Sequence, residues 1–504
     1  MFTQSARRNL TLISVAVLLT ACGDSTGPSS HEPSVKVIAG AGVTDTIEAQ
    51  PIQALIVEVR GDGGKIASGA VVRFEAQPST DPNRPYDPAV SVCGLTVPVC
   101  NYSAFVTDTT DRSGRAKVVV RLGRVVGKAI VRVTVPIFGV QDSATYTVTP
   151  GAPKLVLLSP SDTILDIGGT ATIQAHLADR FGNPRTEVPA LSASAGNSIT
   201  VDAASKMVTA RDMGTQWVYA RYATASDSAI VRVVPAGRLV VWSPGLATVK
   251  LVDINGKNEQ SIITGVQSDW GVFPRFDLTR QRITMHTGTA YYGGPSNDAI
   301  VIDTTRAGRR DIPGIDYIFA VRQTNDGNVM VVGIRNSDSY FSLFRVTADN
   351  TITVVAPLPS FGAIYGGADI SYDGNRVAYI AGSTLNVLDV ATGVTTSLAQ
   401  NAESPRWSVQ GDRLAYLNTT ACSNFLDGAL TVINADGTGR NVLANYCYSP
   451  GLAWSPDGQY VIGRSSQSYT EVGLRIIRVS DGAQVVARFV SGFSQMDYYQ
   501  PDWR

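Results

Sequence analysis

A short turn that recurs at near-constant spacing is the feature that most constrains the fold of this chain. Its clearest copy is Ser455-Pro456-Asp457-Gly458. Proline presets φ at the second turn position, aspartate bonds its own backbone, and glycine supplies the positive φ that closes the turn. Related turns end at residues 280, 327, 374, 411 and 458, so the spacings are 47, 47, 37 and 47 residues. Apolar residues flank each turn and predict two antiparallel strands around it.

Repeats of about 40–50 residues built from strands are typical of β-propeller blades. A sixth copy, residues 499–504, stops after the strand that precedes the turn, while the segments 239–242 and 249–253 have no such strand before them. We therefore expect the last strand to complete the first blade, which gives six blades in a closed ring. The repeats resemble the TolB-like (WD40-like) β-propeller family over about residues 238–504, with Trp454-Ser-Pro-Asp-Gly458 as the intact signature.

The N-terminus resembles a bacterial lipoprotein signal. A basic pair, Arg7-Arg8, precedes an apolar run from Leu10 to Ala21 that is too short to span a bilayer, and the run ends at Cys22. The resemblance implies cleavage before Cys22 and its diacylation, and two acyl chains anchor a protein stably. The rival interpretation is an ordinary secretory signal with an incidental cysteine. Because Gly23 follows the cysteine, resemblance to sorted lipoproteins favours the outer membrane.

The chain contains four further cysteines, which form two plausible disulfide pairs. Cys93 and Cys100 bracket a short loop, and Cys422 and Cys447 lie within one predicted blade. An exported location permits both disulfides. The alternative, a metal site built from four cysteines, lacks paired close spacings.

Two segments between the signal and the propeller alternate apolar and polar residues. In the first we expect strands at 54–59, 71–74, 116–121 and 129–133, and the second runs through the segments 155–160, 163–165, 168–175, 214–220 and 228–233. Short strands at regular spacing predict β-sandwiches. The runs 107–116 and 179–184 resemble bacterial Ig-like domains of the intimin and invasin type.

The predicted fold is all-β: two Ig-like β-sandwiches followed by a six-bladed β-propeller that the C-terminal strand closes. The expected domains are a signal peptide at 1–21, a flexible Gly/Ser/Pro-rich tether at 22–34, Ig-like domains at 35–151 and 152–236, and the propeller at 237–504.

Composition and motifs exclude several functions. The 42 basic and 42 acidic residues cancel, which leaves no electrostatic footprint for nucleic acid. Only three histidines are present, far apart in sequence, so we expect no metal and no cofactor. The sequence has no nucleophile elbow, zincin pair, phosphate loop or EF-hand. The turns 253–256 and 434–437 carry too few carboxylates to enclose calcium.

The remaining candidate site is a loop face. In a propeller, the loops before each innermost strand and those between the second and third strands meet at one end of the channel. Aromatic and acidic residues in these loops suit a binding surface, although several could instead pack between blades. The predicted binding residues are Asp269, Trp270, Tyr291, Tyr292, Asp316, Tyr317, Tyr340, Tyr365, Glu403, Tyr446, Tyr448, Asp497 and Tyr498.

The function we expect is that of a lipid-anchored cell-envelope recognition protein, not an enzyme, whose stalk presents a propeller that binds a protein, peptide or glycan. The alternative is a lyase or hydrolase acting on an extracellular or periplasmic polymer, for which Asp269, Asp316, Glu403 and Asp497 are the candidate acids. Its nearest histidine in sequence, His286, lies inside a predicted strand.

Overall fold

The computed structural model describes residues 32–95, 100–243, 247–265, 272–279, 281–286, 299–335, 338, 340–358, 367–422, 428–465, 474–487 and 499–504. Regular structure in these residues is β-strand, apart from three short 3-10 turns: η1 (Asp62–Gly64), η2 (Pro136–Phe138) and η4 (Thr419–Ala421). The all-β prediction is therefore confirmed. None of the described residues belongs to a helix long and apolar enough to cross a membrane.

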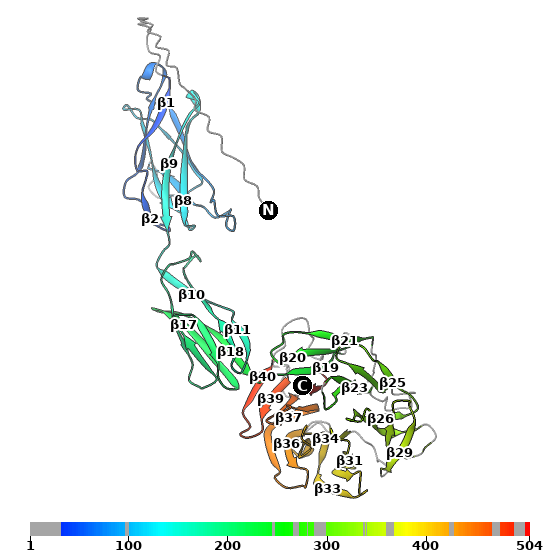
Figure 1. Cartoon of the computed structure of the whole chain (residues 1–504). Helices are drawn as coiled ribbons and strands as arrows, with labels where there is room; N and C mark the ends of the chain where they lie inside the picture. Colours follow the sequence, from blue (N-terminus) through cyan, green and yellow to red (C-terminus); the bar gives the residue numbers. More distant parts are fainter. Residues whose placement is uncertain are drawn as a thin grey trace, which may run out of the picture. The chain divides into compact units, whose positions relative to one another are not determined.

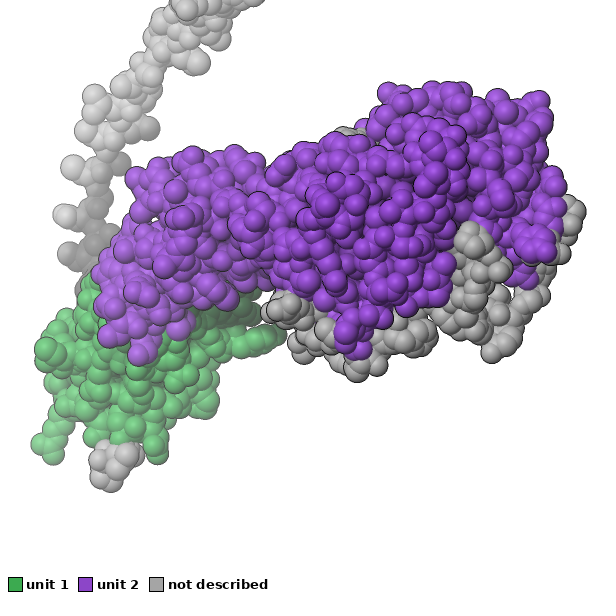
Figure 2. Space-filling view, turned by 90° about the horizontal axis from the view of Figure 1, so that it is seen from below, with its two compact units in different colours: residues 1–152, 178–185 green, residues 153–177, 186–504 purple. Residues whose placement is uncertain are grey.

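The chain divides into two compact units, coloured separately in Figure 2. Unit 1 contains residues 1–152 and 178–185, and unit 2 contains residues 153–177 and 186–504.

Two sheets enclose the apolar core of unit 1. The four-stranded sheet has the order β1 (Ser34–Ala39), β3 (Leu55–Arg60), β7 (Arg115–Leu122), β5 (Val90–Gly94). The five-stranded sheet has the order β2 (Thr44–Thr46), β9 (Val140–Thr149), β8 (Gly127–Val135), β4 (Val71–Ala76), β6 (Phe105–Thr109). Alternate residues of each strand point inward, as in β3, where Leu55, Val57 and Val59 are fully buried. The four strands predicted here are confirmed.

The turn at residues 178–185 belongs to unit 1 and is tied to it by a buried carboxylate. Asp179 is fully buried and accepts hydrogen bonds from the backbone N–H of Gly151 at 2.9 Å and of Phe181 at 2.8 Å. Burial opposes ionisation, but these bonds and those from Asn183 outweigh it and lower the pKa of Asp179. Arg180 in the same turn pairs with Glu48.

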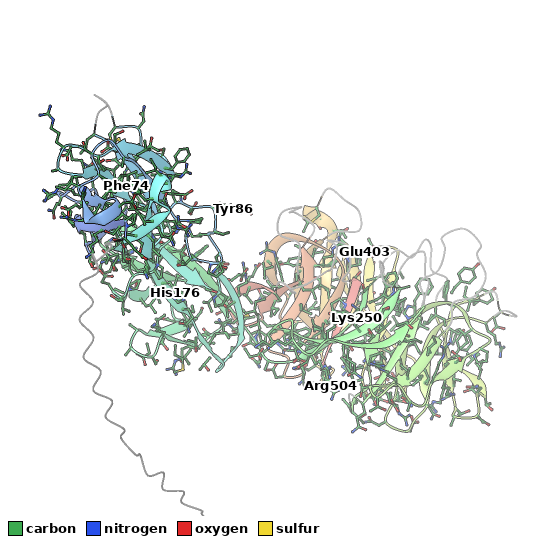
Figure 3. All side chains as sticks on the ribbon, turned by 90° about the horizontal axis from the view of Figure 1, so that it is seen from above. Phe74, Tyr86, His176, Lys250, Glu403 and Arg504 are labelled. Carbon is green, nitrogen blue, oxygen red and sulfur yellow. A yellow bond between two sulfur atoms is a disulfide. The ribbon has the colours of Figure 1, made fainter. Side chains whose placement is uncertain are left out.

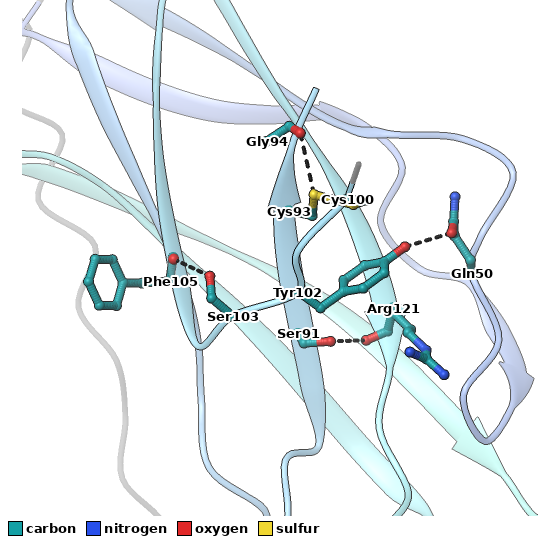
Figure 4. The surroundings of a disulfide bond; sticks show 9 residues. All are labelled: Gln50, Ser91, Cys93, Gly94, Cys100, Tyr102, Ser103, Phe105 and Arg121. Atoms are coloured by element: carbon teal, nitrogen blue, oxygen red, sulfur yellow. Dashed lines mark hydrogen bonds between the residues drawn. A yellow bond between two sulfur atoms is a disulfide. The ribbon is translucent and has the colours of Figure 1, made fainter. Parts of the chain in front are cut away.

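Both predicted disulfides are present. Cys93–Cys100 joins the end of β5 to the segment that follows it, and Cys422–Cys447 joins two segments 25 residues apart. Figure 4 shows the first disulfide beside Tyr102, whose hydroxyl lies 2.6 Å from Oε1 of Gln50.

The first part of unit 2 holds a second apolar core between small sheets. The pair β10 (Pro153–Ser159) and β13 (Gln174–Asp179) lies beside two sheets. One has the order β11 (Asp162–Asp166), β18 (Ala225–Val234), β17 (Gly214–Tyr222), β14 (Ala190–Ala193), and the other β12 (Thr170–Thr172), β16 (Met207–Ala210), β15 (Ile199–Asp202). Within the segment 168–175, Ile173 separates β12 from β13, and these two strands pair with different partners.

Residues 238–504 form a β-propeller, in which sheets stand around a common centre (Figure 1). The first sheet is β41 (Tyr499–Trp503), β19 (Arg238–Ser243), β20 (Thr248–Asp253), β21 (Gln260–Thr264). The second is β22 (Arg275–Phe276), β23 (Arg282–His286), β24 (Ala299–Asp303), β25 (Arg310–Ile312). The third is β26 (Asp316–Gln323), β27 (Val329–Ile334), β28 (Ser342–Val346), β29 (Ile352–Pro357). The fourth is β30 (Ala368–Ile370), β31 (Arg376–Ala381), β32 (Thr384–Asp389), β33 (Thr395–Gln400).

The remaining propeller strands form one seven-stranded sheet. Its order is β34 (Ala402–Trp407), β35 (Arg413–Asn418), β36 (Gly428–Asn434), β37 (Asn441–Trp454), β38 (Tyr460–Ser465), β39 (Leu474–Arg478), β40 (Gln484–Ala487). The strand β37 is 14 residues long and pairs with β36 through its first half and with β38 through its second half.

The recurring turn has the predicted geometry. The glycines that end four copies have φ between +68° and +81°, a region that favours glycine: Gly327, Gly374, Gly411 and Gly458. In each copy the glycine N–H donates to the carbonyl three residues earlier, at 2.9–3.0 Å. In the intact copy, the Ser455 hydroxyl lies 2.5 Å from Oδ1 of Asp457 and accepts a hydrogen bond from the N–H of Tyr460, so side chains hold the turn closed.

The C-terminal strand pairs as predicted. β41 lies antiparallel to β19, with Trp503 opposite Leu239 and Asp502 opposite Val240. Arg238 and Arg504 exchange backbone hydrogen bonds at 3.0 and 2.7 Å, which extends the ladder by one residue. The sheet of β19 is thus completed by residues about 260 positions away in sequence.

Candidate functional site

The centre of the propeller carries buried charges at equivalent positions of the innermost strands. Each position lies one residue before the end of its strand: Arg275, Arg322, Asp369, Arg406, Ala453 and Asp502. The five charged residues, here called the central cluster, are at most 8% exposed. Charges are rarely buried to this degree unless they are paired or hydrogen-bonded.

All three guanidinium nitrogens of Arg322 donate hydrogen bonds to the two neighbouring sheets. Its Nε donates to the Ile370 carbonyl at 2.6 Å, Nη1 to the Phe276 carbonyl at 3.0 Å, and Nη2 to Oδ1 of Asp369 at 3.0 Å. The guanidinium also stacks on the Tyr372 ring at 3.8 Å. Burial alone would lower the pKa of Arg322, but the nearby Asp369 and Tyr372 charges outweigh burial and raise it.

The two aspartates of the cluster also join adjacent sheets. Asp369 accepts the backbone N–H of Trp407 at 2.9 Å, and Asp502 accepts that of Phe276 at 2.7 Å. Burial raises the pKa of Asp502, against the opposing effect of Arg275. Both carboxylates therefore satisfy buried backbone donors, which is a structural role.

Arg275 and Arg406 have a different environment. Nη1 of Arg275 donates to the carbonyls of Pro274 at 2.8 Å and Pro501 at 3.4 Å, and Nη1 of Arg406 donates to the Pro405 carbonyl at 2.7 Å. Burial, followed by the charge of Arg275, lowers the pKa of Arg406 to about 9. Arg406 is therefore still charged at neutral pH.

His286 ends β23 and lies close to these two arginines. It is buried, and its ring stacks on Phe273 with the ring centroids 4.7 Å apart. Burial, followed by the charges of Arg275 and Arg406, lowers the pKa of His286 to about 3, so the imidazole is neutral at pH 7. Its buried Nδ1 has no hydrogen-bond partner among the described residues. The prediction that His286 lies in a strand is confirmed.

Glu403 lies at the start of β34, three residues before Arg406. Figure 3 labels Glu403 and Arg504, which lie at opposite ends of the innermost strands. Oε2 of Glu403 is buried and has no partner in the described part of the chain, and burial raises the pKa of the carboxyl to about 7. A bulge next to Glu403, with Ser404 at φ +50°, interrupts the pairing of β34 with β35. We call the end of the propeller where innermost strands begin the leading end.

Of the predicted binding residues, Tyr340 is 67% exposed and Tyr317 is 38% exposed, although Tyr317 lies in the strand β26 and not in a loop. The prediction that Tyr448 lies in a loop was wrong: Tyr448 is completely buried in β37, where it packs into an apolar cluster. The side chains of Asp316 and Tyr446 lie outside the described part of the structure. Seven further predicted residues lie wholly outside it: Asp269, Trp270, Tyr291, Tyr292, Tyr365, Asp497 and Tyr498.

Sequence reasoning missed the central cluster, although a signal for it exists. A charged residue directly precedes the last residue of the innermost strand in five of six repeats, as in Pro-Arg406-Trp and Pro-Asp502-Trp. The charged residue is arginine in some repeats and aspartate in others, so the position does not form a sequence motif with a fixed residue type.

The described carboxyl groups at the centre of the propeller differ in their partners. Asp369 and Asp502 are committed to backbone N–H groups, which leaves Glu403 as the described carboxyl with a perturbed pKa and an unpartnered oxygen. No group of three His, Cys, Asp or Glu residues suited to a metal ion occurs in the described ranges.

The chain was compared with known proteins at the level of sequence and of structure. The scan against protein-family models finds no match, and the search of curated proteins finds none. Among solved structures, TolB from Acinetobacter baumannii is 14% identical with a TM-score of 0.41, over 53% of this chain and 66% of that one, just under two thirds of its length.

Two other solved structures illustrate the range of functions. An auxiliary nutrient binding protein from Bacteroides thetaiotaomicron is 12% identical with a TM-score of 0.34, over 67% of this chain and 86% of that one. An oligogalacturonate lyase from Vibrio parahaemolyticus is 10% identical with a TM-score of 0.30, over 50% and 85%. These similar structures thus include both binding proteins and enzymes, and they do not decide between the two.

Proposed function

We propose that the chain is a lipid-anchored cell-envelope recognition protein. Two Ig-like β-sandwiches form a stalk, and a TolB-like, six-bladed β-propeller binds a protein, peptide or glycan at its leading end. In this proposal β37 serves two consecutive blades, and diacylated Cys22 holds the protein at the outer membrane. No bound cofactor or metal is required.

One observation carries the proposed binding role: Oε2 of Glu403 is buried at the leading end without a partner in the described residues. A buried polar oxygen that lacks a hydrogen bond costs about 1–3 kcal/mol, and a ligand that donates to it recovers that cost. The exposed aromatic rings of Tyr317 and Tyr340 supply contact area with little rotamer entropy to lose.

The experiment is a binding screen with the full-length protein purified from membranes, using peptide and glycan arrays. Tyr340→Ala is the test variant, and Val394→Ala is its matched control. Val394 is 59% exposed and lies in the hairpin between β32 and β33, at the opposite end of the sheet. A true anchor at Tyr340 should cost more than about 1 kcal/mol of binding, or roughly fivefold in Kd. Equal loss in both variants would contradict a binding site at the leading end.

The same arrays test the alternative function. If the protein turns over an array component and loses that turnover in Glu403→Ala or Asp316→Ala, it is an enzyme and the proposed role is wrong. Unchanged polymer after long incubation, together with saturable binding, supports recognition.

Lipid anchoring has a separate test. Cys22→Ala should move the protein from the membrane fraction to the soluble fraction, because the acyl chains provide the attachment. Protease treatment of intact cells then reports the side of the membrane: loss of the propeller means the cell surface, and protection means the periplasm.

A further inference from the structure

Polar groups of the propeller lie at two levels below the leading end. Glu403 lies opposite Leu417, two ladder positions from the pair Arg406–Ala415. His286 is likewise two positions from Thr284, which lies opposite Arg275, and its carbonyl accepts the N–H of Phe273. A slender group that enters from the leading end therefore meets the carboxyl and the imidazole first and the arginines below them.

The deepest level has an excess of positive charge. The central cluster contains three arginines and two aspartates, so with all five ionised its net charge is 3 − 2 = +1. Asp369 and Asp502 are the cluster's only anions, and Arg322 takes the direct ion pair with Asp369 at 3.0 Å. A net positive charge at such depth is unfavourable, and an anion placed beside it reduces that cost.

Arg275 presents an unused binding edge. Within the described residues it forms no ion pair, and Nη1 is its only nitrogen that donates a hydrogen bond, to two carbonyls. Nε and Nη2 remain, and this pair of parallel N–H groups matches the two oxygens of a carboxylate.

His286 adds a directed polar group on the same path. Its side chain is more than nine-tenths buried, and Nδ1 has no partner among the described residues. A neutral imidazole can donate one hydrogen bond, and Nδ1–H would donate to an anion held by Arg275. The stack on Phe273 fixes the plane of the ring, so the donor is already oriented.

We infer that the centre of the propeller binds a carboxylate, held by the Nε–Nη2 edge of Arg275 and by His286, and supplied by an aspartate or glutamate side chain of a peptide partner. This inference rests on the proposed recognition function and specifies its ligand. Arg406 contributes its positive charge to the same site.

A peptide side chain fits this site better than an acidic sugar does. Arg275 is 5% exposed, His286 4% and Arg406 8%, so only a narrow arm reaches them. An Asp or Glu side chain carries its carboxylate on one or two methylene groups, whereas the carboxylate of a uronic acid is attached directly to a bulky ring. The exposed Tyr317 and Tyr340 rings, both of the third sheet, can contact the peptide next to the inserted residue.

The test measures binding of capped peptides to the full-length protein. The probes are a library of acetylated, amidated hexapeptides with one Asp or Glu at the centre, a matched library with Asn or Gln there, and sodium acetate. A third arm uses oligogalacturonate. The readout is calorimetry, together with the ¹⁵N imidazole signals at pH 7. The chain has only three histidines, so His286→Gln assigns its signal.

The acidic library should bind at least tenfold more tightly than the neutral one, and acetate should shift the His286 signal. Arg275→Gln should reduce the affinity at least tenfold and Arg275→Lys less, because lysine keeps the charge but loses the fork. The control is Arg282→Gln, an exposed position at the start of β23, which should bind like the wild type. Circular dichroism confirms that each variant is folded.

The failures are distinguishable. Equal binding of acidic and neutral peptides that Tyr340→Ala still weakens would overturn the carboxylate site and leave the recognition function standing. Binding of oligogalacturonate alone would overturn the peptide assignment. Absence of saturable binding in every arm would overturn both proposals.

Discussion

The two sides of the central cluster use the same residue type in opposite ways. Arg322 places all three of its nitrogens on protein acceptors in neighbouring sheets, one of them a carboxylate. Among the described residues, Arg275 bonds only carbonyls, through one nitrogen, and it lies near a second arginine and a neutral histidine. A buried arginine can therefore either hold neighbouring sheets together or keep its charge available for a ligand. The acceptors of its hydrogen bonds distinguish the two roles.

Among the variants that test this difference, Arg322→Met should have the largest effect on stability. The change leaves Asp369 as a buried carboxylate without its ion pair and leaves two carbonyls unbonded, so we expect a loss of about 3–5 kcal/mol in the free energy of unfolding. Urea denaturation measures it. The double variant Arg322→Met/Asp369→Asn should lose less than the sum of the two single changes. Strict additivity would show that the pair is not coupled.

A second comparison uses two equivalent tryptophans. Nε1 of Trp454 donates to the Arg406 carbonyl at 3.0 Å, whereas the buried Nε1 of Trp407 has no partner among the described residues. An arginine stacks on each ring, so the packing is matched. Trp454→Phe should therefore destabilise the protein by about 1–2 kcal/mol more than Trp407→Phe, because it leaves a buried carbonyl unpaired. Equal losses in thermal unfolding would refute the difference.

The third prediction concerns pH and Glu403. Burial raises the pKa of Glu403 to about 7 in the folded protein, so between its ordinary pKa of 4.5 and 7 the folded state binds more protons than the unfolded state. The stability contributed by this group is thus complete below pH 4.5 and is lost as pH rises through 7. Glu403→Gln should gain stability relative to the wild type over this range, on the order of 1 kcal/mol after screening of the partly exposed carboxyl. A difference that does not change with pH would exclude a raised pKa.

The smallest effect is expected for Arg275→Gln. The variant loses hydrogen bonds to two carbonyls but also removes the excess positive charge, so its free energy of unfolding should change by less than about 1 kcal/mol. The pKa of His286 should rise in this variant, because one of the two positive charges that lower it is gone. A loss as large as that of Arg322→Met would show that both arginines are structural.

The sequence predicts the repeats well because their turns are local. Asp457 and Gly458 act through backbone angles and bonds that span five residues, and the structure confirms both roles. The pairing of β41 with β19 was also predictable. The first repeat lacks its innermost strand, and the C-terminal segment is an innermost strand without the rest of its repeat.

The central cluster could not be predicted in the same way. Arg322 and Asp369 are 47 residues apart and meet only after the sheets assemble around the centre. Tyr448 was misplaced for a related reason: the connection between two repeats is part of the continuous strand β37, so a residue expected at a loop tip is buried. Strand propensity alone does not distinguish a loop between sheets from a strand shared by them.

The pairing of β41 with β19 also affects how the propeller is made. Until residues 499–503 arrive, β19 presents an unpaired edge, and such edges recruit strands from other molecules. Contacts so distant in sequence form slowly, because a long loop must close before they stabilise anything. We therefore expect the newly synthesised chain to be prone to aggregation until β41 pairs with β19, and a variant that weakens β41 to lengthen that period.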